Sequence, residues 1–142
     1  MKHRLALLAG LAALAAPLFA LAALPVLGTF RVVETIPAPG EGWDYASFDP
    51  ALKRLYVAHG AAVLTLDAET GAVNAAFAPG NRVHAVITVP GTGEILTTNG
   101  GDNTVRFFAP DTGRLIASLP GGRNPDAAIY DPATRLVLVM NN

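Results

Sequence analysis

Residues 124–142 read NPDAAIYDPATRLVLVMNN, and this stretch decides the fold because the chain carries its pattern three times. Residues 43–60 (WDYASFDPALKRLYVAHG) and residues 83–100 (VHAVITVPGTGEILTTNG) repeat the same order of a strand-sized run, a turn that contains proline, and a second apolar run. Successive copies lie 40 and 42 residues apart. A period of this length, filled by short strand-like runs, is typical of a propeller-like array.

Each full repeat divides into four strand-sized runs separated by turn residues. Asp49-Pro50 and residues 90–93 (PGTG) follow the first run, and residues 99–103 (NGGDN) follow the second. Gly71 and Gly113 end the turns before the fourth run, where glycine is free to adopt positive φ. Four short antiparallel strands per repeat is the composition of a propeller blade. The sequence therefore predicts an all-β fold with about two and a half blades, at residues 43–80, 83–120 and 125–142.

The N-terminus has the features of an export signal. Lys2 and Arg4 precede a Leu/Ala-rich run, and residues 20–23 (ALAA) supply small residues at the spacing of a cleavage site. Residues 1–22 are therefore predicted to be a signal peptide, and the mature protein to be periplasmic or secreted. The alternative is an uncleaved membrane anchor, because residues 5–28 carry no charge and are long enough to span a bilayer.

Residues 30–37 (FRVVETIP) read as a strand ended by proline, and they match residues 113–120 (GRLIASLP), the fourth run of the second repeat. We expect residues 30–37 to be an outer strand that closes a ring by completing its final blade. Closure takes about four to eight blades, so the chain is expected to be a fragment whose remaining blades belong to a longer chain. The alternatives are that several copies assemble, or that the fragment does not fold stably alone.

Composition excludes several classes of site. The chain has no cysteine, which excludes disulfides, thiolate chemistry and cysteine-based zinc sites. The formal net charge is −1, and it becomes −3 when residues 1–22 are removed with their two basic residues. Nucleic acid is not an expected partner, because binding to phosphates favours a basic surface. The membrane is an expected partner only through an uncleaved leader.

Several motifs resemble a known repeat family. Residues 97–105 (TTNGGDNTV), 111–113 (DTG) and 124–132 (NPDAAIYDP) are similar to the YVTN-type β-propeller repeat of YncE-like proteins. The resemblance covers residues 30–142 and implies a seven-bladed, extracytoplasmic propeller, but no particular activity. His59 and His84 depart from the repeat, since they stand where the other copies have Asn and Asp.

Polar residues recur where the first run of each repeat begins and where the second run ends. Because consecutive antiparallel strands reverse direction, these two positions lie at the same edge of a sheet. In a propeller whose first strands line the central channel, that edge is the mouth of the channel, and we predict a ligand-binding site there. The predicted site residues are Asp44, His59, His84, Asn99, Asp126 and Asn141.

The chemistry of these residues leaves two interpretations open. Asp44, His84 and Asp126 could hold a divalent metal: carboxylate oxygens suit calcium or manganese, and an imidazole adds zinc or iron. The structural interpretation is that Asp or Asn at a strand start hydrogen-bonds its own turn, and recurrence in every repeat favours it.

The sequence contains no recognisable catalytic set. Ser47 and Ser118 fall within predicted strands and have no nucleophile motif around them. We therefore predict an exported binding or scaffold protein, whose partner is an unidentified small molecule or protein. The alternative is a periplasmic hydrolase or oxidoreductase that depends on a metal or cofactor, with a divalent metal as the candidate, and that uses the channel mouth.

Overall fold

The computed structural model describes residues 30–142, so the predicted signal peptide at residues 1–22 lies outside the described residues. Residues 34–142 form one compact unit. Within the described residues, no helix has the length and apolar character needed to cross a bilayer.

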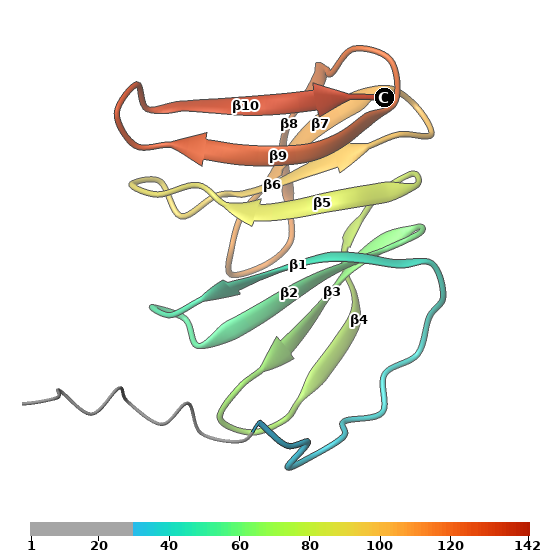
Figure 1. Ribbon diagram of the computed structural model, residues 1–142, viewed down its shortest axis with the longest axis vertical. Coiled ribbons are helices and arrows are strands. Elements are labelled where there is room, and N and C mark those ends of the chain that lie inside the picture. The colour runs from blue at the N-terminus through green and yellow to red at the C-terminus, as the bar shows by residue number, and fades with distance from the viewer. Residues whose placement is uncertain (1–29) are drawn as a thin grey trace, which may run out of the picture. The chain divides into compact units, whose positions relative to one another are not determined.

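The described chain folds into ten strands that form three antiparallel sheets, and it contains no helix (Figure 1). In each sheet the strands lie in sequence order. The all-β class predicted from the sequence is confirmed.

The first sheet contains β1 (Trp43–Asp49), β2 (Arg54–His59), β3 (Ala62–Asp67) and β4 (Val73–Pro79). The second sheet contains β5 (Val83–Thr88), β6 (Ile95–Asn99), β7 (Thr104–Phe108) and β8 (Leu115–Pro120). The third sheet contains β9 (Pro125–Asp131) and β10 (Leu136–Asn141).

The core lies between the first and second sheets, because their facing strands are apolar. Tyr56 and Val63 from the first sheet are fully buried, as are Ile95 and Phe108 from the second. The ring of Tyr56 also packs at 5.7 Å from the ring of Phe77 on β4. Burial of these side chains stabilises the face-to-face packing by about 1.5–3 kcal/mol for each large residue.

The first strands of the three sheets, β1, β5 and β9, lie side by side and run in the same direction (Figure 1). Strand β5 lies between the other two. Their N-terminal ends therefore meet at one edge of the structure, which we call the entry edge. The pairing of Trp43 with His59 and of Val83 with Asn99 places the ends of β2 and β6 at the same edge.

Residues 30–37 form no strand within the described chain. Their expected role was to pair with a final blade that is not among the three sheets described. The ring-closing role of this segment therefore stays a prediction.

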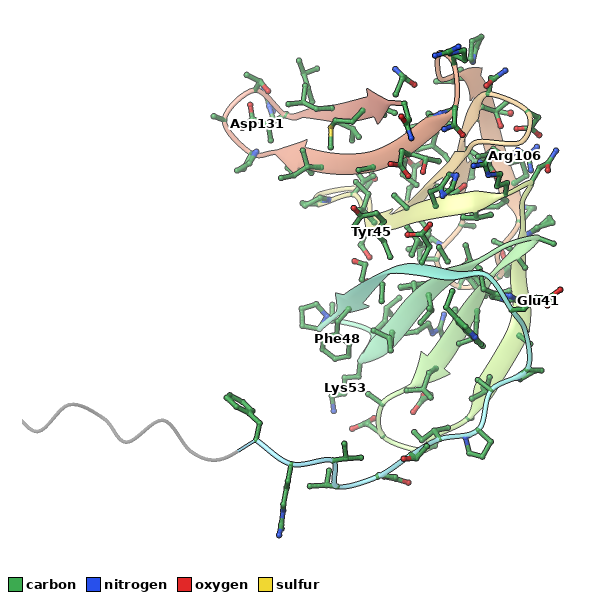
Figure 2. All side chains as sticks on the ribbon, turned by 45° about the vertical axis from the view of Figure 1, so that its right-hand side comes forward. Glu41, Tyr45, Phe48, Lys53, Arg106 and Asp131 are labelled. Carbon is green, nitrogen blue, oxygen red and sulfur yellow. The ribbon has the colours of Figure 1, made fainter. Side chains whose placement is uncertain are left out.

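Turn aspartates fix the opposite edge, where Lys53 and Asp131 lie (Figure 2). In the β3–β4 turn, Asp67 Oδ1 accepts hydrogen bonds from the backbone N–H groups of Glu69 and Thr70 and from the Thr70 hydroxyl. These bonds, first of all the one from the Thr70 backbone, hold the pKa of Asp67 below its ordinary value of 3.8. The ionised carboxylate is therefore favoured in the folded state.

We expect Asp67→Asn to lower the stability of the protein at pH 7 and to have little effect in acid. Because the carboxyl pKa is lower in the folded state than in the unfolded state, its contribution is present above the unfolded-state value and is lost as pH falls through the folded-state value. Urea unfolding midpoints of the wild type and the variant should therefore begin to converge as pH falls below about 4. The control is Asp111→Asn, in the exposed β7–β8 turn. A difference for Asp67→Asn that stays constant from pH 7 to pH 3 would contradict the argument.

Candidate functional site

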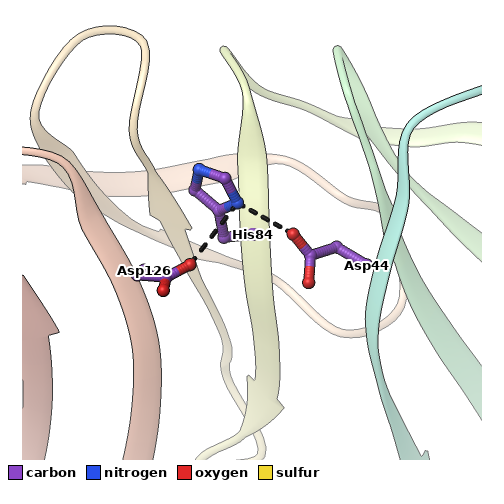
Figure 3. Close-up of side chains that lie close together, drawn as sticks. All are labelled: Asp44, His84 and Asp126. Carbon is purple, nitrogen blue, oxygen red and sulfur yellow. Dashed lines mark hydrogen bonds and ion pairs between the residues drawn. The ribbon is translucent and has the colours of Figure 1, made fainter. Parts of the chain in front are cut away.

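Three side chains from three different sheets converge at the entry edge. His84 lies between two carboxylates: its Nδ1 is 2.8 Å from Asp44 Oδ2 and 3.5 Å from Asp126 Oδ1 (Figure 3). The His84 side chain is 15% exposed, and the two carboxylates are 33% and 41% exposed. We call these residues the Asp–His–Asp cluster. The imidazole is therefore mostly buried, whereas the two Asp side chains are partly exposed to solvent.

A β-bulge orients each side chain of the Asp–His–Asp cluster. In β1 the register changes between Trp43 and Ala46, and in β5 it changes between Val83 and Val86. In β9 the pairing passes from Pro125 to Ala127, which leaves Asp126 as the extra residue. A bulge releases a side chain from the regular alternation of the strand and turns it. The same device in three successive sheets therefore brings the cluster together.

Thr98 links the backbone beside His84 to the backbone of Asp126. Its hydroxyl donates to the backbone oxygen of Asp126 at 2.7 Å and accepts the N–H of Ala85 at 2.8 Å. Thr98 is fully buried on β6, so this hydroxyl joins the second sheet to the start of β9. It thereby holds Asp126 beside His84.

The far side of the His84 ring is a small polar enclosure. His84 Nε2 and Asn124 Oδ1 are both buried, and neither has a hydrogen-bond partner among the described residues. A Cβ placed on Gly100 would lie 2.8 Å from His84 Nε2 and 2.5 Å from Asn124 Oδ1. The absence of a side chain at Gly100 therefore keeps this space open, and both atoms face it.

His59 does not join the cluster, although the sequence placed it at the same edge. Its Nε2 lies 2.9 Å from the backbone oxygen of Ala75, and its ring packs at 5.2 Å from the ring of Trp43. The His59 side chain is buried against Gly40, where a Cβ would approach its Nδ1 to 2.7 Å. These contacts give His59 a packing role.

Asn99 is also structural. It is fully buried, its Oδ1 accepts the N–H of Asn81 at 3.1 Å, and its Nδ2 donates to Thr97 Oγ1 at 3.0 Å. Asn141, the matching residue of the third sheet, is exposed and lies against Gly122. Of the six residues predicted for the site, Asp44, His84 and Asp126 come together.

A hollow of about 200 Å³ lies along the same three strands, just inside the entry edge. Its walls include Tyr45, Ala85 and Ala127, each the next residue after a member of the cluster. Figure 2 shows Tyr45 on the side of β1 that faces β5. The surface beside the cluster is therefore mostly apolar.

Sequence reasoning missed Thr98, Gly100 and Asn124. Thr98 and Gly100 belong to the motif TTNGG, and Asn124 precedes the Pro-Asp pair, so all three lie in stretches that identified the repeat. Thr98 lies in the same sheet as His84, and Gly100 directly follows β6 of that sheet. Asn124 precedes the third sheet, so its place beside His84 depends on packing between sheets, which a repeat pattern within one sheet does not reveal.

Comparison of the chain with known protein families finds no family that matches it, and comparison with curated proteins finds no similar sequence.

Proposed function

We propose that the chain forms part of an exported β-propeller that binds a positively charged ligand at the entry edge and does no chemistry of its own. The observation that carries this proposal is the Asp–His–Asp cluster. Its residues occupy equivalent positions of three successive sheets, and one ligand atom from each lies within 4.8 Å of the others. The export part rests on the signal-like residues 1–22.

Two features support a propeller. The first strands β1, β5 and β9 are neighbours, as they are where blades surround a channel. Strands β8, β9 and β10 also carry large apolar side chains that are 44–57% exposed and suited to packing against further blades. Those side chains are Leu115, Ile116, Leu119, Ile129, Leu136, Leu138 and Met140. A closed ring of about four to eight blades would include blades beyond the three sheets.

The charge of the cluster supports a cationic ligand. Two carboxylates face one imidazole, so the oxygens form a negative rim above the mostly apolar hollow. A partly buried carboxylate pair attracts cations and repels anions more strongly than it would in water, because the local dielectric constant is lower.

Trp43 offers a direct test, because it is the single tryptophan of the chain and adjoins Asp44. The full-length protein would be mixed with Mn²⁺, Zn²⁺, Ca²⁺, agmatine or choline, and separately with phosphate or succinate. We expect one or more cations, and neither anion, to change the Trp43 emission and raise the melting temperature. Asp44→Asn combined with Asp126→Asn should abolish the response.

The matched control is Glu69→Gln combined with Asp111→Asn, which removes two exposed carboxylates from turns at the opposite edge. This variant should respond as the wild type does. Binding of phosphate or succinate, a wild-type response in the Asp44/Asp126 variant, or no response to any cation would overturn the proposal.

A metal-dependent hydrolase is the second candidate function. The observation in its favour is that three protein donors leave coordination positions free for a substrate or water, as in catalytic metal sites. Hydrolysis of p-nitrophenyl acetate or phosphate that requires added metal and disappears in His84→Ala would favour this candidate over pure binding.

A further inference from the structure

His84 faces hydrogen-bond acceptors on both sides of its ring. On one side, Nδ1 faces two carboxylate oxygens, which act only as acceptors when ionised. On the other side, Nε2 faces the enclosure that it shares with the Asn124 oxygen, which is also an acceptor. A neutral imidazole has one N–H, so it leaves one bare nitrogen facing acceptor oxygens.

A metal ion at Nδ1 removes this conflict. The ion would accept electron pairs from Nδ1 and from both carboxylates, and the ring would then carry its proton on Nε2, facing Asn124 Oδ1. Histidines that bind metals usually donate their second N–H to an oxygen in this way, and that bond orients the ring. Once a metal is bound, His84 Nε2 is a donor and Asn124 Oδ1 is an acceptor. These two atoms, which lack partners among the described residues, then suit one another.

The distances within the cluster suit a shared ion. Metal–nitrogen and metal–oxygen bonds of about 2.0–2.2 Å place neighbouring donors about 3.0–3.4 Å apart. Nδ1 lies 2.8 Å and 3.5 Å from the two carboxylate oxygens, and the three donor atoms lie within 4.8 Å of one another. Rotation of the two partly exposed Asp side chains would bring their oxygens, which lie within 4.8 Å of each other, into this range.

We propose that the Asp–His–Asp cluster is a binding site for a first-row divalent transition metal ion, with His84 Nδ1, Asp44 and Asp126 as its protein ligands. Asn124 is a positioning residue whose Oδ1 would accept a hydrogen bond from His84 Nε2 once the metal is bound. The imidazole ligand favours Zn²⁺ or Co²⁺ over Ca²⁺ and Mg²⁺, which prefer oxygen ligands alone, and the two carboxylates also suit Mn²⁺. This inference rests on the proposed function, since it specifies the cation that the entry edge takes.

The test is calorimetric titration of the full-length protein, purified without a histidine tag, with Zn²⁺, Mn²⁺, Ca²⁺ and Mg²⁺. We expect one Zn²⁺ or Mn²⁺ per chain, bound at least tenfold more tightly than Ca²⁺. His84→Ala should weaken Zn²⁺ binding by more than about 100-fold. His84→Asp restores the residue of the other two copies, and it should shift the preference towards Ca²⁺, because all ligands are then oxygens.

Asn124→Gly tests the positioning role. Asn124 has a φ of 45°, and glycine accepts this left-handed backbone while removing the side-chain oxygen. We expect Zn²⁺ affinity to fall about 10- to 100-fold, and the visible spectrum of bound Co²⁺ to change as the imidazole loses its fixed orientation. An unchanged spectrum and affinity would exclude this role.

His59→Asn is the control, because it removes a histidine and installs the residue that the other copies carry at that position. Its metal affinity should equal that of the wild type. Equal binding of Ca²⁺ and Zn²⁺, or Zn²⁺ binding that survives His84→Ala, would overturn the metal assignment and leave the cationic ligand proposal standing. No binding of any cation by the wild type would overturn both.

Discussion

Gly113→Ala is expected to destabilise the protein by about 2–5 kcal/mol, the sum of a backbone cost and an overlap cost. Gly113 has a φ of 69°, a left-handed conformation that costs other residues about 1–2 kcal/mol. A Cβ there would also lie 1.9 Å from the backbone oxygen of Phe77, so the β7–β8 turn would have to move away from β4. Such a change is a large fraction of the stability of a domain. Denaturant unfolding followed by circular dichroism would measure it.

Gly71→Ala is the matched control for this prediction. Gly71 occupies the same turn position in the first sheet, with a φ of 73°, but the nearest atom to its Cβ would be Ile36 Cδ1 at 3.9 Å. It should therefore show the backbone cost alone, about 1–2 kcal/mol. Equal losses for the two variants would show that the contact between the β7–β8 turn and β4 contributes nothing.

Asn99→Ala is expected to cost about 2–4 kcal/mol, because a buried polar network would lose its central member. The Asn99 oxygen accepts the Asn81 N–H and its amide donates to Thr97 Oγ1, which is itself fully buried. Alanine would leave that hydroxyl without this partner and would open a small cavity. The loss would be measured as a shift in the denaturant midpoint at constant slope.

The control for Asn99→Ala is Asn141→Ala, at the equivalent position of the third sheet, where the side chain is exposed. It should change stability by less than about 0.5 kcal/mol. Cation binding per folded molecule should be unchanged in both variants, since neither residue belongs to the Asp–His–Asp cluster. A loss of cation binding in Asn99→Ala but not in Asn141→Ala would instead show that Asn99 belongs to the ligand site.

Much of the fold could be predicted because turn chemistry and strand runs are local. The prolines after Asp49 and Asp131 and the glycines at 71 and 113 mark turns that the structure contains. The strands of the three sheets fall within the predicted ranges 43–80, 83–120 and 125–142. The strand expected at residues 30–37 is not formed within the described chain. A strand requires a partner, and no pattern within eight residues can supply one.

The sequence predicted which edge of the sheets carries the candidate site, but it did not predict which side chains contact one another there. Strand reversal placed Asp44, His59 and Asn99 at the entry edge, and the register agrees. Which side chains meet there depends on the bulges and on packing between sheets. His59 contacts the Ala75 backbone oxygen and the Trp43 ring instead. Asn99 hydrogen-bonds with Asn81 and Thr97, because a buried polar group needs a partner nearby.

By itself the sequence determined the all-β class, the repeating strand and turn order, and the two histidines that break the repeat, since these depend on residues close together in the chain. Only the tertiary structure decided that His84 lies between Asp44 and Asp126 and faces Asn124 across Gly100. The three cluster members belong to three different sheets, and successive members are 40 and 42 residues apart in the sequence. Their distances are fixed by the packing of β1, β5 and β9 and by the Thr98 hydroxyl, which joins two sheets.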